Sequence, residues 1–179
     1  MGNAVAASMA WLPASRAAAQ PSSGDAARGQ SAPPGDRVAP ALPALGSVPV
    51  LPTVSLFDGT EFSPAQAAGK VLVIYWWASW CPFCAQQSPH MEALWRAQRG
   101  RGLRMLALSI DRTPEPAIAY LQKKGYTFPA GLLTPQVAKA LPKPKGLPVT
   151  VVLGRDGRVA MAEAGQLFPE DVEEIARFL

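Results

Sequence analysis

The feature that most constrains this chain is an apolar stretch that leads directly into a Cys-x-x-Cys motif. Val71–Trp77 (VLVIYWW) is a continuous run of β-branched and aromatic residues without alternation. This pattern is typical of a central strand covered on both faces, and periodicity alone does not separate it from a buried helical segment. Cys81 and Cys84 follow shortly after the run. We therefore expect the cysteine pair at the end of a buried strand.

A helix is expected to begin at the first cysteine. Pro82 stands where the first helical turn needs no N–H, and Met91, Leu94 and Trp95 repeat at the i, i+3, i+4 spacing of an amphipathic helix. A thiol at a helix N-terminus faces unpaired N–H groups and the positive end of the helix dipole, which favour the thiolate. Cys81 is therefore the candidate nucleophile.

Cys84 lies one helical turn further and is the candidate resolving cysteine, because it can attack a mixed disulfide formed at Cys81 and release the partner. The chain contains only these two cysteines. In this spacing they can form a structural disulfide, half a metal site or a redox pair. Their place between a strand and a helix favours the redox pair.

The string WCPFC after an apolar strand resembles the thioredoxin superfamily. The longer string YWWASWCPFCAQQSPHMEAL resembles its periplasmic TlpA/ResA-like branch. The resemblance runs from about Val48 to the C-terminus, and it implies a thioredoxin-like α/β fold: a central mixed β-sheet flanked by helices, with an N-terminal β-hairpin. The other expected elements are a hairpin around Asp58-Gly59, a strand over 103–110, helices over 116–124, 135–141 and 169–179, and a hairpin of strands 149–153 and 158–162.

The same resemblance implies residues that position a substrate. Pro148 is expected to be the cis-proline that packs against the disulfide, with Leu147 offering backbone groups to a bound peptide. The residues alone also fit a trans proline that begins a strand. Trp80 is expected to shield the dithiol, as in that family; the alternative is ordinary core packing, and both can hold. Pro82 and Phe83, between the cysteines, neither ionise nor donate a side-chain hydrogen bond, which favours a reductant or a mid-range potential.

One position departs from the family pattern. TlpA-like reductases usually carry a glutamate three residues after the second cysteine, where it handles the proton of that cysteine. This chain has Gln87 there, which cannot accept a proton. Either water serves Cys84, or activity near neutral pH is weaker.

A metal site is disfavoured. A copper or zinc site would combine Cys81, Cys84 and His90, the single histidine. His90 lies about 240° around the helix from Cys84, at about 100° per residue, so it points away from the thiols.

The charge pattern gives no sign of nucleic-acid binding. The net charge is +4, and no Lys/Arg run is dense enough to indicate a nucleic-acid partner. Lys139, Lys143 and Lys145 precede Pro148. They either rim the substrate groove and attract acidic partners, or are ordinary solvated lysines.

Residues 1–47, about a quarter of the chain, are expected to lie outside the folded domain. Residues 1–19 are interpreted as an atypical signal peptide: Ala17-Ala18-Ala19 resembles a small-residue cleavage site, but no Lys or Arg precedes the apolar stretch Ala4–Leu12, and Arg16 interrupts the cleavage region. Residues 20–47 are rich in Pro, Ala, Gly and Ser and are predicted to be a flexible tether. Residues 48–179 form the predicted thioredoxin-like domain. We expect the protein in the bacterial periplasm, soluble or tethered through its N-terminal segment.

Together these residues predict a thiol–disulfide oxidoreductase that reduces protein disulfides, with apocytochrome c cysteines among the substrates that the resemblance implies. Neither an organic cofactor nor a metal is implied, because the electrons reside on the Cys81–Cys84 dithiol. A membrane thiol–disulfide reductase is the expected electron donor. The alternatives are a dithiol oxidase or isomerase, and a non-enzymatic module that binds copper or a partner protein through the same cysteines.

Overall fold

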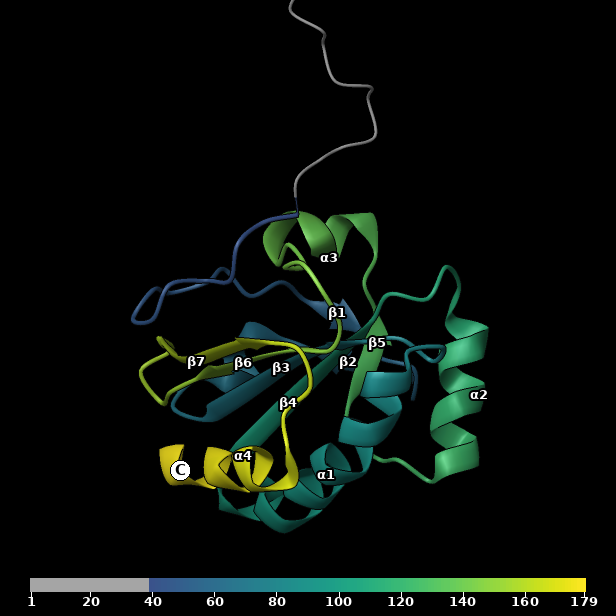
Figure 1. Ribbon diagram of the computed structural model, residues 1–179. Coiled ribbons are helices and arrows are strands. Elements are labelled where there is room, and N and C mark those ends of the chain that lie inside the picture. Colours follow the sequence, from purple (N-terminus) through teal and green to yellow (C-terminus); the bar gives the residue numbers. More distant parts are fainter. Residues whose placement is uncertain (1–38) are drawn as a thin grey trace, which may run out of the picture. The chain divides into compact units, whose positions relative to one another are not determined.

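Strand β3 (Val71–Trp77) is the centre of the sheet. The computed structural model describes residues 39–179, and in it all seven residues of β3 are buried. The strand pairs in parallel with β4 (Leu103–Ser109) on one side and antiparallel with β6 (Val149–Leu153) on the other (Figure 1). Its sequence lacks polar–apolar alternation because both of its faces are covered.

The central sheet has five strands in the order β5-β4-β3-β6-β7. β4 and β5 are parallel, whereas β6 is antiparallel to both of its neighbours, so the sheet is mixed as predicted. The predicted N-terminal hairpin forms a separate two-stranded sheet. The remaining elements are β1 (Val54–Ser55), β2 (Glu61–Phe62), η1 (Pro64–Ala67), α1 (Pro82–Gln98), η2 (Arg99–Arg101), α2 (Pro114–Lys124), β5 (Ala130–Leu132), α3 (Pro135–Ala140), β7 (Val159–Ala164), α4 (Pro169–Glu174) and η3 (Ile175–Phe178).

Alternate residues of β3 enter two different cores. Val73 and Tyr75 face a cluster built with residues of α1, α2, α4 and η3. Leu72 and Ile74 face a second cluster built with α3 and the β1–β2 hairpin. Helices therefore cover one face of the sheet, and α3 with the hairpin covers the other (Figure 1). The cysteines belong to the first of these clusters.

Apart from shifts of one or two residues at the ends of other elements, the structure differs from the sequence-based expectation in three places. The closing helix is shorter than the predicted 169–179, because α4 gives way to the 3-10 helix η3. Strand β5 was not predicted. Hydrogen bonds to the domain begin before the predicted boundary at residue 48, since Gly46 N donates to Val159 O and Val159 N donates to Ser47 O. The predicted signal peptide, and residues 20–38 of the predicted tether, lie outside the described residues.

The described helices are short. Over residues 39–179, no helix is long and apolar enough to cross a membrane.

Candidate active site

Cys81 is the N-cap residue of α1, and Pro82 occupies the first helical position as expected. Its sulfur accepts a hydrogen bond from the Cys84 N–H at 3.2 Å. Both cysteines are free thiols and nearly inaccessible, with 4% of Cys81 and 1% of Cys84 exposed. The helix N-terminus thus directs an N–H group at the Cys81 sulfur, which is where a nucleophile of this motif is expected.

Cys84 has a contrasting environment. Burial raises the pKa of the Cys84 thiol well above its ordinary value, and its hydrogen bond with Cys81 adds to this effect. Hydrogen bonds from the Ala78 backbone and from Tyr75 act in the opposite direction. At neutral pH Cys84 is therefore a protonated thiol, so the two sulfurs are chemically distinct.

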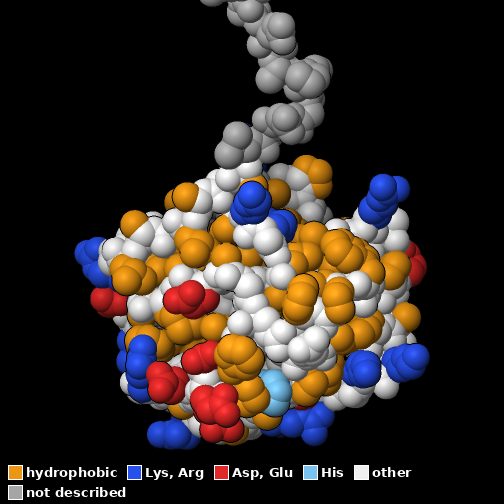
Figure 2. All heavy atoms as spheres, in the orientation of Figure 1, with side chains coloured by type: hydrophobic (Ala, Val, Ile, Leu, Met, Phe, Trp, Pro, Cys, Tyr) orange, Lys and Arg blue, Asp and Glu red, His pale blue; other side chains and the backbone are white. Residues whose placement is uncertain are grey.

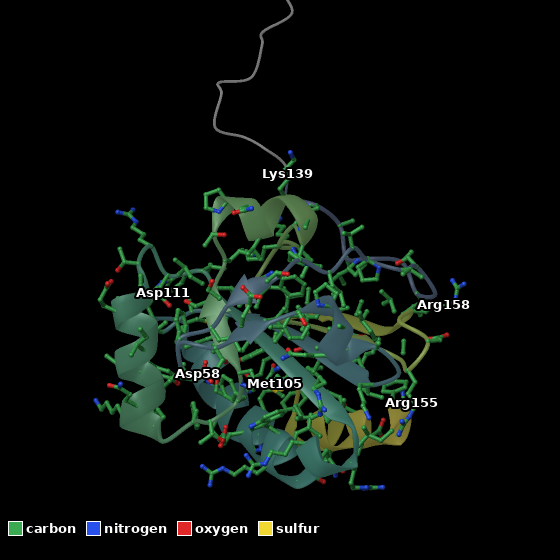
Figure 3. All side chains as sticks on the ribbon, turned by 180° about the vertical axis from the view of Figure 1, so that it is seen from behind. Asp58, Met105, Asp111, Lys139, Arg155 and Arg158 are labelled. Carbon is green, nitrogen blue, oxygen red and sulfur yellow. The ribbon has the colours of Figure 1, made fainter. Side chains whose placement is uncertain are left out.

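A buried carboxylate holds the loop that precedes the cysteines. Asp111, immediately beyond β4, accepts hydrogen bonds from Ser79 N at 3.1 Å, from Ser79 Oγ at 2.7 Å and from Ser109 Oγ at 2.6 Å. Figure 3 shows Asp111 beside the start of α2. Asp111 directly follows the predicted strand over 103–110, and the sequence alone did not identify it as a functional residue. The sequence did contain a signal for it. Asp111 is an acidic residue at the carboxyl end of β4, which is the neighbour of β3, and β3 leads to Cys81.

An exposed apolar rim surrounds the buried thiols. Trp80 is 65% exposed and Phe83 is 54% exposed, and Pro82 between the cysteines is also exposed. The interpretation of Trp80 as a core residue is therefore wrong, because its side chain lies on the surface beside the motif. Figure 2 shows that hydrophobic side chains occupy much of the visible face, while most of its acidic side chains gather at the lower left, next to basic ones.

The Leu147–Pro148 peptide bond is cis. Leu147 is half-buried and packs against the hydrophobic cluster that contains both cysteines. Val149, the first residue of β6, pairs with Trp76 near the end of β3. The predicted substrate-positioning segment therefore lies at the same end of β3 as the Cys-x-x-Cys loop.

The Gln87 side chain makes hydrogen bonds that connect α1 to other parts of the structure. Its side chain is fully buried, its Nε2 donates to Thr150 Oγ1 at 2.9 Å, and its Oε1 accepts from Leu167 N at 2.8 Å. The amide thereby joins α1 to β6 and to the segment before α4. Its polar atoms are committed to these partners, in addition to being unable to take a proton.

The three lysines before Pro148 differ from one another. Lys139, which points out from α3 (Figure 3), and Lys145 are exposed. Lys143 Nζ turns back to donate to Pro144 O at 2.6 Å and Gly146 O at 2.7 Å. Burial lowers the pKa of Lys143, while the electrostatic effect of Cys84 acts in the opposite direction. Lys143 is therefore held by the backbone of its own loop and interacts electrostatically with Cys84.

The disfavoured metal site would need Cys81, Cys84 and His90 to come together. Within 39–179, no group of three or more His, Cys, Asp or Glu side chains is placed to hold a metal ion. His90 is half-buried on α1.

Comparison with known proteins places this geometry in a family. The Redoxin family model matches residues 35–179. The thiol-disulfide oxidoreductase ResA of Geobacillus thermodenitrificans is 25% identical over 132 residues, which is 73% of this chain and 75% of that protein.

Two solved structures share the fold. A thiol:disulfide interchange protein of the thioredoxin family from Chlorobium tepidum TLS superposes with a TM-score of 0.69 at 22% identity, over 75% of this chain and 97% of that one. A secreted Mycobacterium tuberculosis disulfide oxidoreductase, homologous to E. coli DsbE, gives 0.63 at 17% identity, over 73% and 97%. The family model, the ResA relative and the shared fold agree with the motif at the start of α1: this chain belongs to the Redoxin family and is a TlpA/ResA-like thiol–disulfide oxidoreductase of the thioredoxin superfamily.

Proposed function

We propose that the enzyme reduces disulfides of exported proteins, with Cys81 as the attacking thiol and Cys84 as the resolving thiol. The observation that carries this proposal is the difference between the two sulfurs. Cys81 Sγ receives an N–H at the helix N-terminus, whereas burial keeps Cys84 protonated. Thiolate character determines which thiol attacks first.

In the first step, the Cys81 thiolate attacks one sulfur of the substrate disulfide. A bond forms between Cys81 Sγ and that sulfur, the substrate S–S bond breaks, and the other substrate sulfur leaves as a thiolate and takes up a proton. In the second step, Cys84 loses its proton and attacks Cys81 Sγ. The mixed disulfide breaks, the substrate leaves fully reduced, and the protein retains a Cys81–Cys84 disulfide.

Substrate positioning falls to the rim around the thiols. Leu147 is proposed to pair its backbone with an extended substrate segment, beside the cis-proline Pro148. Trp80, Pro82 and Phe83 supply exposed apolar area next to Cys81, which suits the unfolded or loosely folded segments that carry accessible disulfides.

The direction of electron flow is proposed from what lies between the cysteines. Pro82 and Phe83 offer no side-chain hydrogen bond that would stabilise the reduced form and make the pair a strong oxidant. The electrons reside on the dithiol itself, so the reaction as proposed needs no organic cofactor or metal.

We further propose an extracytoplasmic location, in the periplasm. The interpretation of residues 1–19 as an export signal and the secreted M. tuberculosis relative support this location. A membrane thiol–disulfide reductase is then required to recharge Cys81–Cys84, and apocytochrome c thiols are one class of substrate to test.

The test is the equilibrium reduction potential of Cys81–Cys84 in a glutathione buffer, together with reduction of a protein disulfide. Thioredoxin-fold couples span about −270 mV for thioredoxin to about −120 mV for DsbA. We expect a value toward the reducing end, no activity in Cys81→Ala, and a trapped mixed disulfide with Cys84→Ala. A potential near the DsbA end would overturn the proposed direction in favour of an oxidase of exported thiols.

A further inference from the structure

A buried tyrosine lies behind the active-site helix and has no part in the exchange described so far. Tyr75 of β3 is inaccessible, and its ring packs edge-on against Phe128, with centroids 6.4 Å apart. Its hydroxyl donates to the Cys84 carbonyl at 3.4 Å and shares a 3.1 Å hydrogen bond with Ser88 Oγ. The Tyr75 hydroxyl therefore lies against the turn of α1 that carries Cys84.

The hydrogen bond with Ser88 can leave the hydroxyl proton of Tyr75 free to be donated elsewhere. Ser88 is fully buried four residues after Cys84, and either oxygen of the Tyr75–Ser88 pair can donate. When Ser88 donates to Tyr75 Oη, the single tyrosine proton is free to turn to another acceptor. To do so, the Tyr75 hydroxyl would give up its long, weak hydrogen bond to the Cys84 carbonyl oxygen.

The other groups around Cys84 are poorly suited to assist its deprotonation. Besides Cys81 and Tyr75, two other side chains interact electrostatically with Cys84: Tyr120 of α2 and Lys143 in the segment before β6. Tyr120 Oη is buried without a hydrogen-bond partner among the described residues. Lys143 is bonded to backbone carbonyls, and the Gln87 amide, as described above, is committed to β6 and to Leu167.

We propose that Tyr75, oriented by Ser88, donates a hydrogen bond to the Cys84 sulfur as that sulfur becomes a thiolate in the resolving step. The inference rests on the proposed roles of Cys81 and Cys84. Cys84 gives up its proton to solvent or to the departing substrate thiolate, its electron pair forms the bond to Cys81 Sγ, and Tyr75 remains protonated throughout. The hydroxyl thereby supplies part of the assistance that a glutamate at position 87 gives in TlpA-like proteins.

The experiment follows the two steps separately with a chromogenic aromatic disulfide, dithiobis-nitrobenzoate, in stopped flow. The first thionitrobenzoate is released when Cys81 attacks, and the second when Cys84 resolves the mixed disulfide. Tyr75→Phe keeps the ring and removes only the hydroxyl. Tyr120→Phe is the matched control, because it removes a nearby buried hydroxyl that bonds nothing.

We expect Tyr75→Phe to leave the first phase unchanged and to slow the second about tenfold, the effect of losing one hydrogen bond to a charged group. Because the variant raises the pKa of Cys84, its second-phase rate should reach the wild-type value only about one pH unit higher. Ser88→Ala should slow the same phase by a smaller factor, and Tyr120→Phe should not slow it.

A second phase in Tyr75→Phe as fast as in the wild type would overturn the inference, as would equal slowing by Tyr120→Phe. If Tyr75→Phe does not fold, the second phase of Ser88→Ala decides in the same way. Loss of the first phase in the wild-type protein would instead count against the proposed function of Cys81, so the two failures are distinguishable.

Discussion

Removal of the Asp111 carboxylate should loosen the loop that carries the motif. The carboxylate accepts both the N–H and the hydroxyl of Ser79, two residues before Cys81, and it also accepts the Ser109 hydroxyl. These bonds connect the end of β4 to the loop between β3 and α1. We compare Asp111→Ala, which deletes all three bonds, with Asp111→Asn, which keeps the shape of the side chain.

The two variants should lose different amounts of unfolding free energy. Hydrogen bonds to a charged group contribute about 1.5 kcal/mol each at the lower end of the measured range. Three such bonds give about 4.5 kcal/mol, and we reduce this to about 3 kcal/mol for Asp111→Ala because Ser79 is half-exposed and water replaces part of the loss. In Asp111→Asn the carbonyl oxygen can accept from Ser79 N and Ser109 Oγ, while the amide donates to Ser79 Oγ. Only the charge is lost, and because neutral bonds are about half as strong, the expected cost is about 1.5 kcal/mol.

The measurement is the free energy of unfolding from urea titration, with the first phase of the chromogenic exchange as the functional readout. Asp111→Ala should slow attack by Cys81 more than Asp111→Asn does, because only the alanine variant frees the Ser79 backbone. An Asp111→Ala cost below about 0.5 kcal/mol would show that water holds the loop equally well. A cost for Asp111→Asn as large as for Asp111→Ala would contradict the hydrogen-bond account and leave the charge as the only contribution.

Three further residues test other parts of the structure. Burial would raise the pKa of Glu92, but hydrogen bonds from Thr127 and other donors outweigh this effect and lower the pKa. A carboxyl with a lowered pKa stabilises the folded protein at pH values above its unfolded pKa of 4.5. The loss of unfolding free energy in Glu92→Gln, measured by urea unfolding, should therefore be full at pH 7 and shrink as the pH falls below 4.5. Gly131→Ala should cost about 2 kcal/mol in the same assay, because a Cβ there would lie 2.6 Å from Ser55 O; a neutral result would mean that the β1–β2 hairpin moves freely. Trp80→Ala should change the unfolding free energy by less than about 0.5 kcal/mol while slowing protein-disulfide reduction more than reaction with the small aromatic disulfide, and equal slowing of both would remove Trp80 from substrate contact.

The central strand and the cysteine helix could be predicted because their signals are local. Val71–Trp77 lacks alternation, which indicates a strand buried on both faces, and the structure has the same bounds. Pro82 at the first helical position and the apolar spacing behind it located the start of α1. Each of these signals lies within a few residues of the element that it specifies.

The features that were missed depend on residues far apart in the chain. β5 has only three residues, Ala130–Leu132, and its place follows from the free edge of β4 and from the hairpin that contacts Gly131. Gln87 finds its partner in Thr150, 63 positions away. The exposure of Trp80 could not be predicted for a related reason. Trp76, Trp77 and Trp80 stand close together in the sequence, and tertiary packing decides which of them is buried.

Because Tyr75 is a phenol and not a carboxylic acid, the rate of the resolving step should depend on pH differently from that of an enzyme with a glutamate near Cys84. A glutamate near Cys84 titrates within reach of the physiological range and would give the resolving rate an inflection where it loses its proton. Burial, followed by the charge of Cys84, raises the pKa of Tyr75 well above its ordinary value, so the hydroxyl stays protonated across the physiological pH range. The second-phase rate should therefore rise continuously from about pH 5 to pH 9 with the thiolate fraction of Cys84 alone. An inflection near neutral pH that persists in Tyr75→Phe would reveal a titrating group behind Cys84 other than the tyrosine, and would refute the assignment of a neutral donor to this site.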